Sequence, residues 1–127
     1  MNELLPQDKA DIARAEAIVA LGYPAVKPIL PDLVGWLLDY NWPVARVLGP
    51  FLGTIGLPLL PHARHVLGTN DDVWKYWVLS LLVKPSIPLA AALKEELERL
   101  ANVPTAGEIA EELDLEAREI LDSLKAA

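Results

Sequence analysis

KPILPD at 27–32, LPLLPH at 57–62 and IPLAAA at 87–92 repeat one pattern at an interval of thirty residues. Each stretch has a proline in its second position, namely Pro28, Pro58 and Pro88. A helix tolerates proline in its first turn, because the N–H group that proline lacks has no intrahelical partner there. The spacing therefore predicts three helices that begin at these prolines, and a fixed interval of this length is typical of stacked helical repeats.

Short polar residues recur at the same interval in the other half of each unit. Asp11, Asn41 and Asp71 can each accept a hydrogen bond from the free N–H groups of a following helical turn, which makes them candidate N-caps. Asp114 has the same position at the start of a shorter unit that closes the chain. The caps are thus expected to be as periodic as the prolines.

Apolar residues behind these caps follow the three-and-four spacing of an amphipathic helix, and no alternating run between tight turns suggests a strand. The expected helices cover 9–21, 25–38, 43–55, 58–67, 72–83, 87–101 and a last span from 108 or 114 to 125. We therefore predict an all-α fold, a short α-solenoid of about seven helices in antiparallel pairs, in one compact domain over 1–127. Its repeats would be 11–40, 41–70 and 71–100, with a half repeat at 114–127.

Composition and charge narrow the classes of partner. The chain has 127 residues and a formal net charge of -7, which is the wrong sign for neutralising phosphates, so nucleic acid is not an expected partner. It has no cysteine, which excludes disulfides and thiolate chemistry. The N-terminus lacks the features of a signal peptide, and the longest uncharged run, 47–61, is broken by glycines and prolines. We expect a cytoplasmic protein, monomeric and without a membrane partner.

Several motifs resemble those of known families. The helix that starts near Asn41 and carries Val44 and Arg46 looks like a HEAT-type repeat. DYNWPVA at 39–45, WKYW at 74–77 and PTAGE at 104–108 through EELD at 111–114 resemble the DUF5071 domain proteins, a small bacterial family of unknown function. The resemblance runs from LLPQDK at 4–9 to the last helix, and the segments 49–56 and 83–87 depart from it in being apolar or rich in glycine and proline. It implies a helical-repeat fold and no particular activity.

Tryptophan and tyrosine account for seven of the eight aromatic residues, and they gather at matched places in two units. Their side chains combine a large apolar area with a polar tip, which suits a binding surface as well as a core. Trp42, Trp74 and Tyr76 are therefore candidate binding residues, whereas Trp36 and Trp77 are expected to fill space between repeats.

Charged residues near these aromatic side chains could form a second part of the same site. Arg46 and Lys75 could lie on one face beside Asp39 and Asn41 and bind an acidic group. The alternative is an ion pair between repeats, from Arg46 to an acid such as Asp39 or Asp72, since the arginine fork suits such contacts.

Gly49, Pro50, Gly53 and Gly56 fall within a predicted helix, where each glycine costs about 0.5 to 1 kcal/mol relative to alanine. Something must offset that cost. These residues either let a kinked helix pack closely against a large neighbour such as Trp77, or they form with Trp77 the wall of a pocket.

Candidate acid and base groups are few. His62 and His65 lie three residues apart without a third ligand at a recognisable spacing, so no metal site is predicted. Thr105 and Glu108 have the spacing of a capping box, which starts a helix. If an apolar pocket exists, Asp39, His62, His65 or Glu108 could serve as a base in it.

No motif for nucleophilic catalysis, phosphate binding or a cofactor is found, and none of these is expected. Residues 86–127 hold ten acids and four bases, which is consistent with a solvated face or with a basic partner. The first hypothesis is a non-enzymatic protein-interaction module, a helical-repeat adaptor or immunity-like protein that binds through a concave aromatic face. The alternative is a binder of small apolar or aromatic molecules, or an acid/base enzyme, natural or engineered, with an apolar pocket lined by tryptophan.

Overall fold

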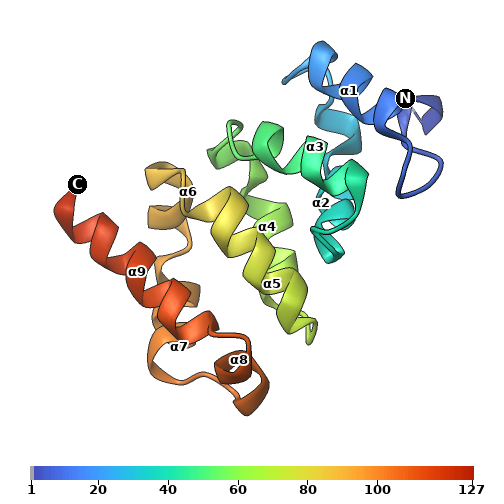
Figure 1. The fold of residues 1–127 in the computed structure, drawn as a ribbon. Helices are drawn as coiled ribbons and strands as arrows, with labels where there is room; N and C mark the ends of the chain where they lie inside the picture. The colour runs from blue at the N-terminus through green and yellow to red at the C-terminus, as the bar shows by residue number, and fades with distance from the viewer. Residues whose placement is uncertain (1) are drawn as a thin grey trace.

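Helices hold 73% of the chain in the computed structural model, which describes residues 2–127. Within that range there is no strand, so the all-α prediction is confirmed. Figure 1 shows the helices following one another from the N-terminus at one end of the molecule to the C-terminus at the other. None of the helices in the described range is long and apolar enough to cross a membrane.

The first half of the chain holds four α-helices joined by short 3-10 turns. The α-helices are α1 (Ile12–Leu21), α2 (Leu30–Gly35), α3 (Pro43–Leu52) and α4 (Leu60–Leu67). The 3-10 turns are η1 (Asn2–Leu4), η2 (Lys27–Ile29), η3 (Trp36–Leu38) and η4 (Leu57–Leu59). Pro28 and Pro58 lie at the starts of η2 and η4, where each missing N–H group is tolerated.

The second half is built from five α-helices. They are α5 (Asp72–Val78), α6 (Ile87–Ala92), α7 (Lys94–Asn102), α8 (Ala106–Ala110) and α9 (Leu113–Ala126). A π-helical turn, η5 (Leu79–Val83), extends α5. Pro88 lies in the first turn of α6, so all three periodic prolines stand where the sequence predicts them.

Helix caps follow the prediction at two of the four expected places. Asp11 accepts from the N–H of Arg14 at 3.3 Å, and Asp71 accepts from the N–H of Trp74 at 3.0 Å. The prediction for Asn41 is wrong, because α3 starts one residue later and Trp42 stands at its N-cap with no side-chain hydrogen bond. That for Asp114 is also wrong, since α9 begins at Leu113.

The expected number of about seven helices is wrong, since residues 2–127 hold nine α-helices. The expected helix 87–101 is interrupted at Leu93, whose φ of -103° and ψ of 15° leave the helical range. For the last expected helix, a start at 108 is wrong, because Glu112 adopts a left-handed backbone with φ of 60° and divides that span. The alternative start at 114 agrees with α9 to within one residue. Both breaks occur at residues that are neither glycine nor proline, so composition gives no sign of them.

The helices are arranged in two layers. In the first, α1 packs on α3, α3 packs on η5, and both α5 and η5 pack on α9. In the second, α2 packs on α4, and α6 packs on η4 and α7. Contacts of α4 with α5 and of α7 with α9 join the layers, and Figure 1 shows α3, α5 and α9 in front of α2, α4 and α7.

A continuous core of aliphatic side chains fills the space between the layers. Fully buried members from successive elements include Ile18, Leu33, Leu48, Leu59, Leu79, Leu89 and Leu93. Because this core reaches from α1 to α9, it fixes the orientation of the central helix α5, around which the candidate site residues are distributed.

Candidate functional site

Helix α5 presents three groups of side chains on three of its sides. Asp72 and Lys75 are three residues apart and share one side of the helix, where they form an ion pair. Tyr76 and Trp77 are consecutive residues, and they are grouped by the contact between their rings and by the hollow that both of them line. Trp74 lines a different hollow, with His62 and His65. Each group contacts a different part of the molecule.

The first side of α5 forms an ion cluster of Asp72, Lys75, Arg99 and Glu108. Lys75 Nζ lies 2.9 Å from Glu108 Oε2 and 2.9 Å from Asp72 Oδ1. Arg99 donates to both oxygens of Glu108, at 2.7 Å to Oε2 and 3.1 Å to Oε1. Only 1% of Glu108 and 4% of Lys75 is exposed. The cluster therefore ties α8 to both α5 and α7, with Lys75 and Glu108 buried and with Asp72 and Arg99 partly exposed at the wall of a hollow.

Glu108 also completes the predicted capping box of α8, which is confirmed. The N–H of Thr105 donates to Glu108 Oε1 at 2.8 Å, and the N–H of Glu108 donates to Thr105 Oγ1 at 3.1 Å. One carboxylate thus satisfies a helix N-terminus and two cations at once.

These contacts decide the charge state of the ion cluster. The Arg99 guanidinium above all, with the Lys75 ammonium and the N–H of Thr105, holds the pKa of Glu108 well below its usual range despite the opposite effect of burial. Burial by itself would lower the pKa of Lys75, but hydrogen bonds and charges from Glu108 and Asp72 outweigh it and raise that pKa. Glu108 is therefore an ionised carboxylate whose two oxygens both accept hydrogen bonds. Such a group suits a structural contact between helices rather than proton transfer.

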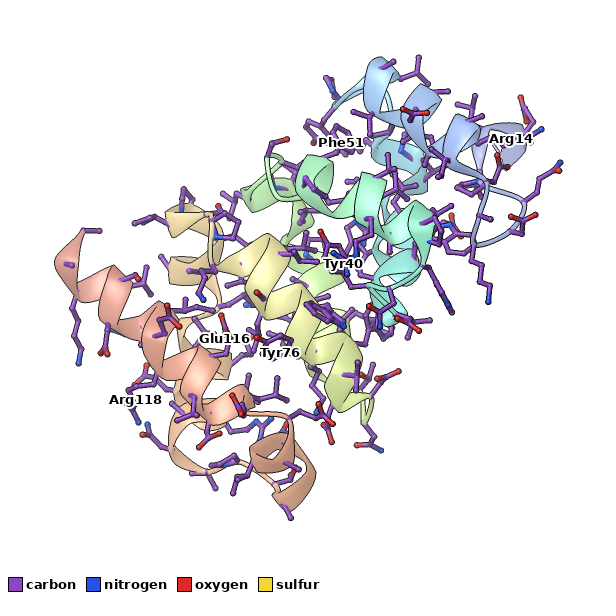
Figure 2. All side chains as sticks on the ribbon, in the orientation of Figure 1. Arg14, Tyr40, Phe51, Tyr76, Glu116 and Arg118 are labelled. Atoms are coloured by element: carbon purple, nitrogen blue, oxygen red, sulfur yellow. The ribbon has the colours of Figure 1, made fainter. Side chains whose placement is uncertain are left out.

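The second side of α5 belongs to a line of ring contacts, which we call the aromatic row: Tyr40, Trp77 and Tyr76. The ring centroids of Tyr40 and Trp77 are 5.0 Å apart, and those of Trp77 and Tyr76 are 5.2 Å apart. The guanidinium of Arg46 lies 4.7 Å from the centroid of Tyr40, at one end of the row. Figure 2 shows Tyr40 between α3 and α5, and Tyr76 on the side of α5 that faces α9.

The other end of the aromatic row opens into an acidic hollow of about 250 Å³. Its walls are Val73, Tyr76, Trp77, Ala110, Glu111 and Glu112. Glu111 and Glu112 are exposed, and they stand at the junction of α8 and α9. The hollow thus combines aromatic faces with two carboxylates.

The third side of α5 forms a histidine hollow of about 190 Å³ between α2, α4 and α5. Its walls are Pro31, Val34, His62, His65, Val66 and Trp74. Trp74 Nε1 donates to the carbonyl oxygen of Val34 at 3.1 Å, which holds the indole ring across to α2. The ring of His65 meets that of Trp74 edge to face, with centroids 6.4 Å apart.

The remaining predicted binding residues lie around the start of α3. The N–H of Asn41 donates to Asp39 Oδ1 at 2.9 Å, and Arg46 Nε donates to the carbonyl oxygen of Tyr40 at 2.9 Å. Trp42 packs edge to face on Trp36, with centroids 5.8 Å apart. Both rings line a separate hollow with Leu5 and Pro6. The structure therefore brings Asp39, Asn41 and Arg46 together but leaves Lys75 in the ion cluster.

The glycine-rich stretch of α3 is where two helices approach closely. A Cβ atom on Gly49 would lie 2.8 Å from a ring carbon of Tyr40, and one on Gly53 would lie 2.6 Å from the carbonyl oxygen of Leu81. Gly56 follows α3 with φ of 77°, and Pro50 is exposed inside the helix. These contacts favour the close-packing interpretation, with Tyr40 and Leu81 as the neighbours of the two glycines. Trp77 contacts Tyr40 instead.

Sequence reasoning missed the partners of Glu108. The capping box explains its position locally, but Lys75 lies thirty-three residues away, and no spacing rule connects the two residues. Arg99 fits a surface pair with Glu95 by helical spacing, yet it reaches Glu108. Within residues 2–127, no three acidic or histidine side chains form a group that could hold a metal ion.

The order of the helices and the side chains grouped around α5 define an all-α domain with one central helix. A family model described as "Domain of unknown function (DUF5071)" matches residues 4–121, and the chain belongs to this family. A search of curated proteins finds no match.

Proposed function

We propose that this protein is a non-enzymatic protein-interaction module, an adaptor or immunity-like protein, that binds a partner through the aromatic row. The observation that carries this proposal is the continuous set of rings from Arg46 and Tyr40 to Trp77 and Tyr76, all of which are only partly buried except for the exposed Arg46. Partly buried tyrosine, tryptophan and arginine side chains are the types that contribute most to binding at protein interfaces.

The acidic hollow supports a basic surface on that partner. Glu111 and Glu112 lie beside the rings of Tyr76 and Trp77, so a lysine or arginine side chain could contact a ring face and a carboxylate together. Residues 86–127 carry six more acids than bases, and this negative charge would attract a basic partner over a longer range.

We further propose that the two layers are a short HEAT-like solenoid, with repeats at 11–40, 41–70 and 71–100 and a closing half repeat at 114–127. The regular positions of Pro28, Pro58 and Pro88 and the order in which neighbouring helices pack support this proposal. In such an array the layer of α3, α5 and α9 would be the binding side. A cytoplasmic location stays a prediction of the sequence.

Affinity capture with matched variants tests the interaction. Tyr76→Ala removes the end of the aromatic row, and Glu111→Lys reverses a charge of the acidic hollow. Val19→Ala removes an exposed apolar side chain from α1, outside the proposed surface, and is the control. Thermal unfolding of each variant establishes that it remains folded.

We expect one or more proteins with basic surfaces to be captured by the wild type and by Val19→Ala, and to be lost with both other variants. Binding by purified partner and module would then weaken as salt is raised, because charges contribute to it. Capture that is the same for all four proteins, or no capture by the wild type after cross-linking, would contradict the proposal.

A further inference from the structure

The histidine hollow is a small apolar recess with two imidazole groups on one wall. Its volume of about 190 Å³ is below the 300–1,000 Å³ range of pockets for drug-sized ligands. A cavity of about 150 Å³ in a protein core is large enough for benzene. The histidine hollow is therefore of a size to hold a single six-membered ring with one small substituent.

The walls of this hollow are fixed before any ligand arrives. The hydrogen bond from Trp74 Nε1 to the carbonyl oxygen of Val34 joins α5 to α2 and sets the plane of the indole. His65 packs edge to face on the same indole. A flat ring can pack against such an aromatic wall with little loss of side-chain freedom.

The imidazoles supply the polar part of the site. Among the described residues, neither the imidazole of His62 nor that of His65 has a hydrogen-bond partner. Burial and the nearby charge of His65 both lower the pKa of His62. His62 is thus a neutral imidazole at pH 7, with one nitrogen that donates and one that accepts.

The charged side chains of α2, α4 and α5 do not line the histidine hollow. Asp32 of α2 lines the hollow of Trp36 and Trp42. Arg64 of α4 pairs with Glu96, and Asp72 and Lys75 of α5 belong to the ion cluster. The two histidines are the titratable groups of the six residues that line the histidine hollow, so it holds neither a fixed cation nor a carboxylate.

We propose that the histidine hollow binds a small neutral aromatic alcohol of the phenol class, with its ring against Trp74 and its hydroxyl donating to an imidazole nitrogen of His62. A carboxylate would lack a permanent positive charge to pair with, and an ammonium would lack a negative one. This site lies on a different side of α5 from the aromatic row, so it does not depend on the proposed protein interaction.

Titration with phenol, followed by the indole N–H signal of Trp74, tests the proposal. Benzoate and benzylamine are the charged comparisons of similar size. We expect phenol to shift the Trp74 signal in a saturable way at pH 7.5 and to bind more tightly than either charged compound. Its affinity should fall as the pH is lowered through the pKa of His62, because the imidazolium no longer accepts a hydrogen bond.

Two substitutions at one position separate the hydrogen bond from the shape of the hollow. His62→Leu keeps an apolar wall and removes the acceptor, and it should weaken phenol binding about fivefold, as expected for one neutral hydrogen bond. His62→Gln keeps an acceptor that does not titrate, so phenol should still bind and the pH dependence should disappear. Val73→Ala, on another side of α5, should leave phenol binding unchanged.

Three results would overturn the inference. One is the absence of a saturable shift of Trp74 up to the solubility limit of phenol. The second is tighter binding of benzoate or benzylamine than of phenol at pH 7.5. The third is unchanged phenol affinity in a folded His62→Leu variant.

Discussion

Helix α5 and the π-helical turn η5 that extends it are joined to their neighbours by opposite means. Toward α3, the contact is made by η5 and is very close, with Gly53 at the end of α3 directly against the backbone of Leu81. Toward α8 the contact is made by ions, with Lys75 and Glu108 buried together. The first junction depends on glycine having no side chain, and the second depends on the opposite charges of Lys75 and Glu108.

The two junctions are destabilised by different kinds of substitution. A close apolar junction is broken by adding atoms, since neither backbone can move without disturbing the core. A buried ionic junction is broken by removing one partner, since the other is then left charged and out of contact with water. An added methyl group should therefore destabilise the first junction, and removal of a carboxylate should destabilise the second.

Glu108→Ala should have the largest effect. It leaves Lys75 buried with Asp72 alone and also removes the capping box of α8. We expect a loss of about 3–5 kcal/mol in the free energy of unfolding, measured by urea denaturation. A loss below about 1 kcal/mol would show that the ion cluster does not hold α8.

Gly53→Ala should come next, with a loss of about 2 kcal/mol, because the new methyl group meets a carbonyl oxygen rather than a flexible side chain. Gly35→Ala is the matched control. It lies in α2 with no atom within 4 Å of its future Cβ, so it should stabilise the protein by about 0.4–1 kcal/mol. Equal effects of the two substitutions in urea denaturation would contradict the close-packing account.

Acid should weaken the ionic junction and not the apolar one. The pKa of Glu108 in the folded chain is lowered from an unfolded value of about 4.3, so its contribution is complete above that value and is lost as pH falls below it. Below that pH, we expect the free energy of unfolding to fall by up to about 1.4 kcal/mol per pH unit, because Glu108 takes up one proton on unfolding. The difference in stability between wild type and Glu108→Gln should narrow over the same range, and a constant difference would contradict this assignment.

Glu96→Ala should have the smallest effect. Glu96 pairs with Arg64, which is half exposed on α4, and exposed ion pairs contribute about 0–1 kcal/mol. We expect a change below about 0.5 kcal/mol in urea denaturation. A loss comparable to that of Glu108→Ala would mean that burial does not distinguish the two ion pairs.

Local signals in the sequence account for much of the fold. Proline positions, the caps at Asp11 and Asp71 and the capping box at Thr105 all depend on neighbouring residues, and all are found where they are predicted. The break at Leu93 is not predicted, because the helical pattern runs through 87–101 without glycine or a second proline. The left-handed backbone at Glu112 is not predicted either, since it is uncommon for a residue other than glycine.

The candidate site shows the same division. Helical spacing places Trp74 and Trp77, three residues apart, near each other on α5. Their assignment to different hollows depends on which neighbouring helices pack on each ring, so it is not predicted from the sequence. The meeting of Lys75 with Glu108 depends on how α8 folds back over α5, which no local rule supplies. Long-range ion pairs and close backbone contacts are therefore the parts that required the structure.

The central claim is that the sides of α5 are separate surfaces with separate chemistry. The indole N–H signals of the four tryptophans, assigned by single substitutions to phenylalanine, test it in one NMR experiment. An arginine-rich peptide should shift the signal of Trp77, and phenol should shift that of Trp74, while those of Trp36 and Trp42 stay in place. A common response of all four signals to both probes, or a response of Trp74 to the peptide and of Trp77 to phenol, would contradict the account.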